Sequence, residues 1–71
     1  MKRAIVTYEF PHGTVEIDYD EEDEGYDLID AETGTCLNLG DRWYNVGIPD
    51  IAEVAVYLAE YHPEMLQANY Q

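Results

Sequence analysis

The chain has 71 residues, with sixteen Asp and Glu against three Lys and Arg, and a formal net charge of −13 at pH 7. This length predicts a single domain, residues 1–71, whose thin core leaves little room for a deep catalytic cleft. The charge would repel nucleic acid and anionic membranes, so we expect neither as a direct partner, and no apolar stretch approaches the length of a membrane span.

Residues 2–10 are rich in β-branched and aromatic side chains, which is typical of a strand. Residues 11–13 (PHG) predict a turn. Residues 14–20 alternate cleanly, with Val15, Ile17 and Tyr19 on one face and Thr14, Glu16, Asp18 and Asp20 on the other. This alternation predicts a second, half-buried strand that pairs with the first in a hairpin.

Residues 26–30 predict a third strand after a charged turn, and the break in alternation at Ile29-Asp30 indicates a bulge or the end of that strand. Residues 30–34 predict a hairpin loop with Gly34 in the left-handed conformation. Residues 35–39 (TCLNL) then predict a fourth strand with Leu37 and Leu39 facing inward. Residues 40–47 predict either a loop or a short fifth strand over residues 43–46.

The helix signal follows this region. Asp50 is expected to cap the helix with Glu53 as its partner in a capping box. The helix should bury one apolar stripe, formed by Ile51, Val54, Ala55 and Leu58. Pro63 should end it near residues 61–62 and open a short helical turn over residues 64–69, with Met65 and Leu66 packing back.

These elements predict an α+β fold in which a four-stranded or five-stranded antiparallel sheet is covered on one face by a C-terminal helix, followed by a short helical turn. The uncovered face should carry the acidic residues of the second strand. Cys36 is the single cysteine, which excludes an internal disulfide and favours a reducing, cytoplasmic setting.

The acidic residues cluster between positions 16 and 32. Glu16, Asp18 and Asp20 should project from one face of the second strand about 6.6 Å apart, which is of the same order as the spacing of phosphates along a nucleic-acid strand. The expected partner-binding surface adds the acidic turn and two neighbouring aspartates: Glu21, Glu22, Asp23, Glu24, Asp27 and Asp30. Solvation of the sheet face and adaptation to high salt are the alternative explanations of this acidity.

Catalytic and metal sites find little support in the sequence. A calcium loop starting at Asp18 or Asp20 places Ile29 or Ala31 where a bidentate Glu is required. His12, Cys36 and His62 lack the paired spacing of zinc ligands, and the chain contains no serine nucleophile. We therefore expect no catalytic residue, no metal and no cofactor.

Trp43 and Tyr44 lie beside Arg42 in the ambiguous segment. Exposed Trp, Tyr and Arg are enriched at binding hot spots, so Trp43 and Tyr44 are added to the expected partner-binding residues. Packing against the core or the end of the sheet is the other interpretation of these two rings.

The length, the excess of acids and the run EIDYDEEDEGYD resemble the small acidic proteins that phages use against bacterial defence, namely nucleic-acid mimics and anti-CRISPR inhibitors. The resemblance is compositional. It implies an inhibitor in the host cytoplasm that occupies the basic nucleic-acid-binding surface of a nuclease or surveillance complex. An antitoxin or accessory subunit that docks through aromatic residues is the alternative, and a homodimer is compatible with either.

Overall fold

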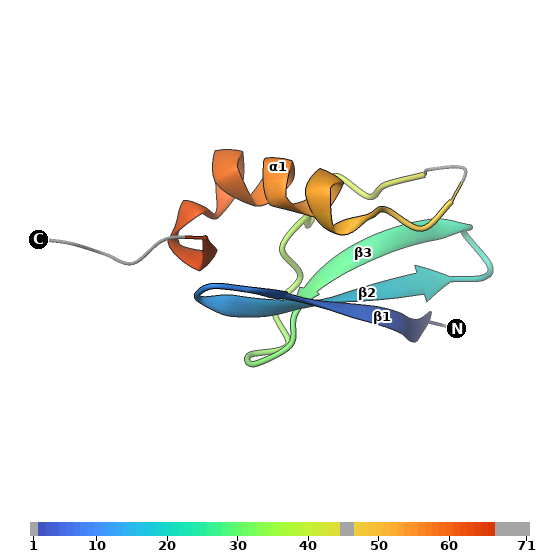
Figure 1. The fold of residues 1–71 in the computed structure, drawn as a ribbon. Helices are drawn as coiled ribbons and strands as arrows, with labels where there is room; N and C mark the ends of the chain where they lie inside the picture. The colour runs from blue at the N-terminus through green and yellow to red at the C-terminus, as the bar shows by residue number, and fades with distance from the viewer. Residues whose placement is uncertain (1, 45–46, 67–71) are drawn as a thin grey trace, which may run out of the picture.

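The computed structural model describes residues 2–44 and 47–66. Its elements are β1 (Lys2–Phe10), β2 (Gly13–Asp20), β3 (Gly25–Asp30), α1 (Ile51–Tyr61) and a 3₁₀ turn (Pro63–Met65). The strands form an antiparallel sheet in the order β1-β2-β3, and α1 lies across one face of it (Figure 1). The α+β class and the helical cover predicted from the sequence are therefore confirmed.

The core lies between α1 and the sheet. It consists of Val15, Ile17, Tyr26, Leu28, Val54, Leu58 and Met65, all buried. Alternation along β2 sends its apolar residues to this side, as its sequence predicts. A bulge interrupts the pairing of β1 with β2 between Ala4 and Val6, whereas β3 keeps a regular register and ends at Asp30.

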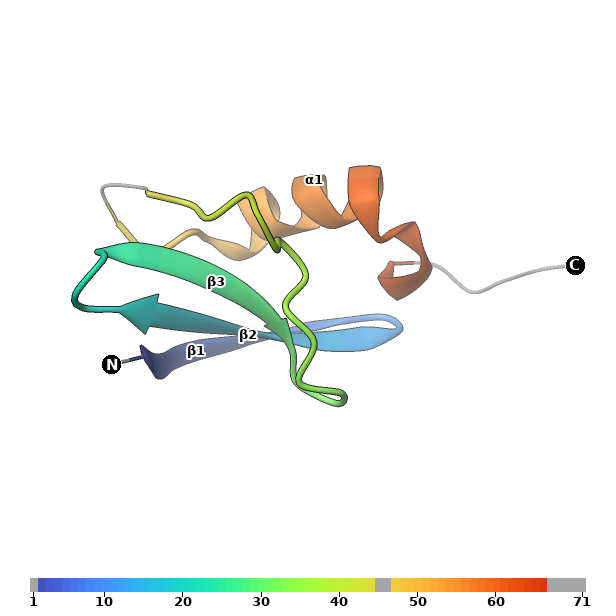
Figure 2. The same cartoon turned by 180° about the vertical axis from the view of Figure 1, so that it is seen from behind.

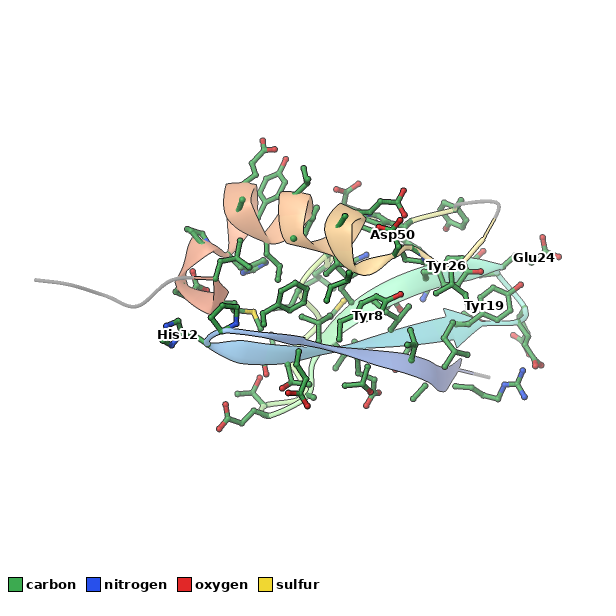
Figure 3. All side chains as sticks on the ribbon, in the orientation of Figure 1. Tyr8, His12, Tyr19, Glu24, Tyr26 and Asp50 are labelled. Carbon is green, nitrogen blue, oxygen red and sulfur yellow. The ribbon has the colours of Figure 1, made fainter. Side chains whose placement is uncertain are left out.

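Two hydrogen bonds tie β1 and its hairpin to the helical region. The Tyr8 hydroxyl donates to the Pro49 carbonyl at 2.8 Å, just before α1. The His12 backbone N–H donates to the Met65 carbonyl at 2.9 Å. Figure 3 shows Tyr8 pointing from β1 toward the helix layer and His12 at the hairpin turn. The turn predicted at residues 11–13 is confirmed, with β2 starting at Gly13.

Helix α1 begins as predicted. The Asp50 side chain accepts from the Glu53 N–H at 2.8 Å, and the Glu53 side chain accepts from the Asp50 N–H at 2.9 Å. Val54 and Leu58 are buried, but Ile51 is 47% exposed. The predicted stripe is thus too wide at its start, because Ile51 is the first helical residue and no preceding turn shields it.

The prediction of a fourth strand over residues 35–39 is wrong. Instead of a strand, the described chain after β3 forms two isolated bridges with its edge, Ile29 with Cys36 and Tyr26 with Trp43. Between them the Asn38 side chain takes the place of a strand: its Oδ1 accepts from the Leu28 N–H at 3.0 Å, and its Nδ2 donates to the Tyr26 carbonyl at 3.3 Å. Figure 2 shows this connection running beside β3.

As a consequence, Leu39 does not face inward but is 85% exposed, while Leu37 packs partly against the core. The fifth strand predicted over residues 43–46 is reduced to the single bridge at Trp43, and residues 45–46 lie outside the described part. The loop at residues 30–34 is confirmed, with φ of 79° at Gly34. The final helical turn spans Pro63–Met65 with Leu66 as its C-cap, and residues 67–69 of its predicted range lie outside the described part.

Candidate functional site: the acidic sheet face

The central strand β2 carries a row of three carboxylates on the sheet face away from α1. Glu16, Asp18 and Asp20 alternate with the buried Val15 and Ile17, so they share the opposite face, and all three are half-buried. Figure 3 shows oxygen-tipped side chains projecting from this side of the sheet. The arrangement predicted for this row is therefore present in the structure.

The two aspartates of β3 differ in their placement. Asp27 lies opposite Asp18 in the register, on the same face as the row, but it is 5% exposed. Asp30 lies opposite Val15 and is therefore on the other face of the sheet. Its Oδ1 accepts from the Glu32 N–H at 2.9 Å, which shapes the loop after β3. Asp27 thus extends the row as a buried member, and Asp30 does not extend it.

The turn from Glu21 to Glu24 continues the acidic surface into solvent, and all four of its residues are exposed. Its shape is set by Asp20, whose Oδ1 accepts from the N–H groups of Glu22 at 3.1 Å and Asp23 at 3.4 Å. Glu24 adopts a positive φ of 56°, which closes the turn before Gly25. Figure 3 shows Glu24 at the tip of this end of the sheet.

A single arginine organises three carboxylates of this surface. The Arg42 Nε and Nη2 donate to the two oxygens of Asp27 at 3.0 and 2.7 Å, a bidentate pair. Its Nη1 donates to Asp20 at 3.2 Å and to Asp23 at 2.7 Å. The arginine stem crosses directly over Gly25, where any Cβ would collide with it. Glycine at this position is therefore required by the close approach of Arg42.

The hydrogen bonds of this network shift the pKa values of Asp20 and Arg42. Desolvation opposes the charge on Asp20, but the backbone N–H groups of Asp23 and Glu22 and the Arg42 guanidinium outweigh it and lower the pKa of this carboxyl. Hydrogen bonds to Asp27 foremost, then to Asp23 and Asp20, raise the pKa of Arg42 above its ordinary value. With three carboxylates against one guanidinium, the cluster carries a formal negative charge.

The two aromatic residues of the expected binding surface point to opposite sides. Trp43 is half-buried on the helix side, where its ring meets Tyr57 edge-on with centroids 5.4 Å apart. Tyr44 is 62% exposed and lies on the acidic side, with its hydroxyl donating to Asp23 at 2.9 Å. That hydrogen bond raises the pKa of the Tyr44 phenol. Trp43 therefore packs at the sheet end, and Tyr44 belongs to the acidic surface.

Sequence reasoning missed Arg42 and Asn38 as organisers of the site. One feature of the sequence could have drawn attention to Arg42: it is the only Lys or Arg beyond the first three positions of a chain with sixteen acidic residues. The corresponding feature of Asn38 is weaker: it is a polar amide between two leucines. It is 1% exposed, and its Nδ2 also donates to the Asp41 carbonyl at 3.3 Å, so it positions the segment that delivers Arg42.

The candidate nucleophile and imidazole are occupied with structural contacts. The Cys36 thiol donates to Asn38 Oδ1 at 3.3 Å, and the His62 Nε2 donates to the Leu37 carbonyl at 2.8 Å. A cavity of about 520 Å³ lies beside Arg42 and is lined in part by Asp27, Cys36, Asn38, Leu39 and Asp41. Within residues 2–44 and 47–66, no group of three or more Asp, Glu, His or Cys side chains is arranged to hold a metal ion.

Comparison of the chain with protein-family models, with curated proteins and with solved structures gave no match. Among the described residues, no helix has both the length and the apolar character needed to cross a bilayer. The site is therefore defined here by its own geometry: a carboxylate row on β2, an exposed acidic turn, and an arginine that holds the two together.

Proposed function

We propose that this chain is a non-catalytic binding protein that occupies the basic, nucleic-acid-binding surface of a partner protein through its acidic sheet face. The observation that carries the proposal is the row of Glu16, Asp18 and Asp20 on one face of the central strand. Successive members are separated by about 6.6 Å, which is comparable to the spacing of phosphates in a nucleic-acid strand. A groove that binds phosphates would therefore meet carboxylates at similar intervals.

The way in which the row is held supports a binding role. Carboxylates on a sheet are fixed in direction by the backbone, and Asp20 is further held by Arg42 and by the turn that it shapes. A fixed charge array loses less conformational entropy on binding than flexible side chains do. The net charge of −13 would also steer a basic partner toward the chain over long distances.

Inhibition of a nuclease or surveillance complex in the host cytoplasm is the form of this function that we favour. A stoichiometric competitor needs only to cover the surface on which nucleic acid lies. The acidic residues lie on a sheet face rather than in an enclosed cleft, and Cys36 and His62 are engaged in hydrogen bonds, so a binding role agrees with the geometry better than an enzymatic one.

The test uses two variants with the same change in net charge. The first neutralises three acids of the proposed surface: Glu16→Gln, Glu22→Gln and Glu24→Gln. The second neutralises three acids elsewhere: Glu32→Gln, Glu60→Gln and Glu64→Gln. Neither variant touches Arg42 or its three carboxylates, so both should keep the fold, which circular dichroism would verify.

Partners are captured from a bacterial lysate at low salt and eluted at high salt, and the affinity of each captured protein is then measured for both variants. We expect the first variant to bind at least about ten-fold more weakly than the second, and nucleic acid to compete with the chain for the same partner. Equal losses in the two variants, or a partner that holds the chain and nucleic acid together, would refute the proposal.

A second candidate is an accessory or antitoxin-like subunit that docks through exposed apolar side chains. The observation in its favour is that Leu39 and Tyr44 are 85% and 62% exposed, and both line the cavity beside Arg42. Binding of this kind would tolerate high salt and would be lost in Leu39→Ser, while the acid-neutralised variants would bind normally.

A further inference from the structure

The outer edge of β1 offers backbone groups for pairing. β1 has β2 as its only neighbour in the sheet order, and among the described residues no backbone hydrogen bond reaches Lys2–Phe10 from any other segment. Beyond the bulge at Ala4/Val6, residues 6–10 pair regularly with β2. A regular edge of this kind presents N–H and C=O groups on which another chain can add a strand.

Short side chains separate this edge from the acidic row. Ala4 lies opposite Asp18, and Thr7 lies opposite Glu16, so both are on the acidic face of the sheet. Both are exposed. Because neither is bulky, the carboxylates of the central strand can be approached sideways across β1. Glu9, opposite Thr14, adds a further exposed carboxylate on the same face of β1 itself.

We propose that the β1 edge is a strand-addition site for an extended, basic segment of the partner protein. An added strand would lie about 4.8 Å from β1 and about 9.6 Å from β2. Lysine or arginine at every second position of that strand would project over Ala4 and Thr7 toward Asp18 and Glu16. This inference rests on the proposed function and adds to it the conformation of the partner and the side from which it approaches.

Charge determines the kind of occupant and where it pairs. A second copy of this chain would bring another −13 to the same edge, so a basic segment is the favoured occupant. The N-terminal end of β1 is basic, and Arg3 there forms an ion pair with Glu21 at 2.8 Å. A basic strand is therefore expected to pair along residues 6–10, beside Glu9 and Glu16, with its end reaching over Ala4 toward Asp18 but stopping short of Arg3.

Two synthetic peptides of equal charge test the proposal on the whole chain. One is a ten-residue alternation of lysine and threonine, which can form a strand ladder. The other also contains five lysines, with proline at both odd and even positions, so that whichever of its edges faces β1 lacks backbone donors. We expect the lysine–threonine peptide to bind at least about ten-fold more tightly and to slow amide hydrogen exchange within residues 6–10.

The outcomes separate this inference from the proposed function. Equal binding of the two peptides, or no binding of either at low salt, would overturn strand addition, while competition between the chain and nucleic acid for a captured partner could still hold. Slowed exchange in β1 that grows with protein concentration, without any peptide, would assign the edge to a second copy and would also overturn it.

A matched pair of variants tests the sideways approach. Ala4→Lys places a cation between the edge and the acidic row, whereas Ala59→Lys makes the same change on the exposed side of α1. We expect Ala4→Lys to weaken the lysine–threonine peptide about ten-fold more than Ala59→Lys does, and equal effects would contradict the proposal. The comparison of the two peptides remains decisive if Ala4→Lys fails to fold.

Discussion

The buried amide of Asn38 provides the sharpest test of the fold. In Asn38→Ala, the buried Leu28 N–H loses its partner, whereas the Tyr26 carbonyl still accepts from the Trp43 N–H at 3.2 Å. A buried backbone group left unsatisfied costs about 1–3 kcal/mol, so the Leu28 N–H alone predicts a loss of about 2 kcal/mol. The third bond, to the Asp41 carbonyl, adds little because Asp41 is exposed and water can replace the amide.

This loss is large for a small domain, whose whole stability is of the order of 5 kcal/mol. The neighbouring residue is the control: Leu39 is 85% exposed, so Leu39→Ala should change stability by less than about 0.5 kcal/mol. A strand with Leu39 facing inward would give the reverse order, since truncation of a buried leucine costs about 2–5 kcal/mol.

Urea denaturation followed by Trp43 fluorescence measures both variants, because this ring packs against Tyr57 in the folded state. We expect Asn38→Ala to have a clearly lowered midpoint and Leu39→Ala to match the parent chain. A loss below about 1 kcal/mol in Asn38→Ala would refute the role assigned to the amide.

Three further predictions concern ionisable groups. Arg42→Gln makes the chain more acidic, yet it should lower the stability of the fold by about 2–3 kcal/mol in urea denaturation, because Asp27 loses its guanidinium partner. It should also weaken partner binding, because the acidic turn loses its anchor. Tighter binding would show that net charge alone matters. Asp23→Asn should lower the pKa of Tyr44, as measured by ultraviolet absorbance, because the hydrogen bond to the Asp23 carboxylate raises this pKa. A tyrosine whose pKa is raised on folding stabilises the fold only below the ordinary tyrosine pKa, so its contribution to stability disappears as the pH rises through the pKa of the folded state. An unmoved titration would contradict the assignment. Asp50→Ala should cost about 1 kcal/mol in the same denaturation assay by removing the helix cap, and an unchanged midpoint would argue against the capping box.

Features determined by neighbouring residues could be predicted from the sequence. The alternation along β2 determined which residues face α1 and which form the acidic row. The pattern from Asp50 to Glu53 located the start of the helix, and Gly34 was correctly placed in the left-handed conformation. Each of these depends on backbone geometry within a few residues, which local composition records.

Features determined by distant residues could not be predicted. The segment TCLNL alternates as a strand would, but the contact of Asn38 with the β3 backbone, ten residues away along the chain, replaces the strand ladder. The pairing of Arg42 with Asp27 and Asp20 spans fifteen and twenty-two residues. Nothing in the local sequence distinguishes an arginine that binds three carboxylates from one in solvent, and so Asp27 could not be recognised as buried.

The connections between the β1–β2 hairpin and the helical region have a consequence for the order of folding. The three strands are joined by short turns, whereas the Tyr8–Pro49 hydrogen bond closes a loop of 41 residues. Because closing a long loop costs more entropy than closing a turn, we expect the sheet to form early and α1 to dock late. Asp18 and Asp27 would then face each other before Arg42 arrives, so the repulsion between them would slow folding at low ionic strength, and added salt would accelerate it.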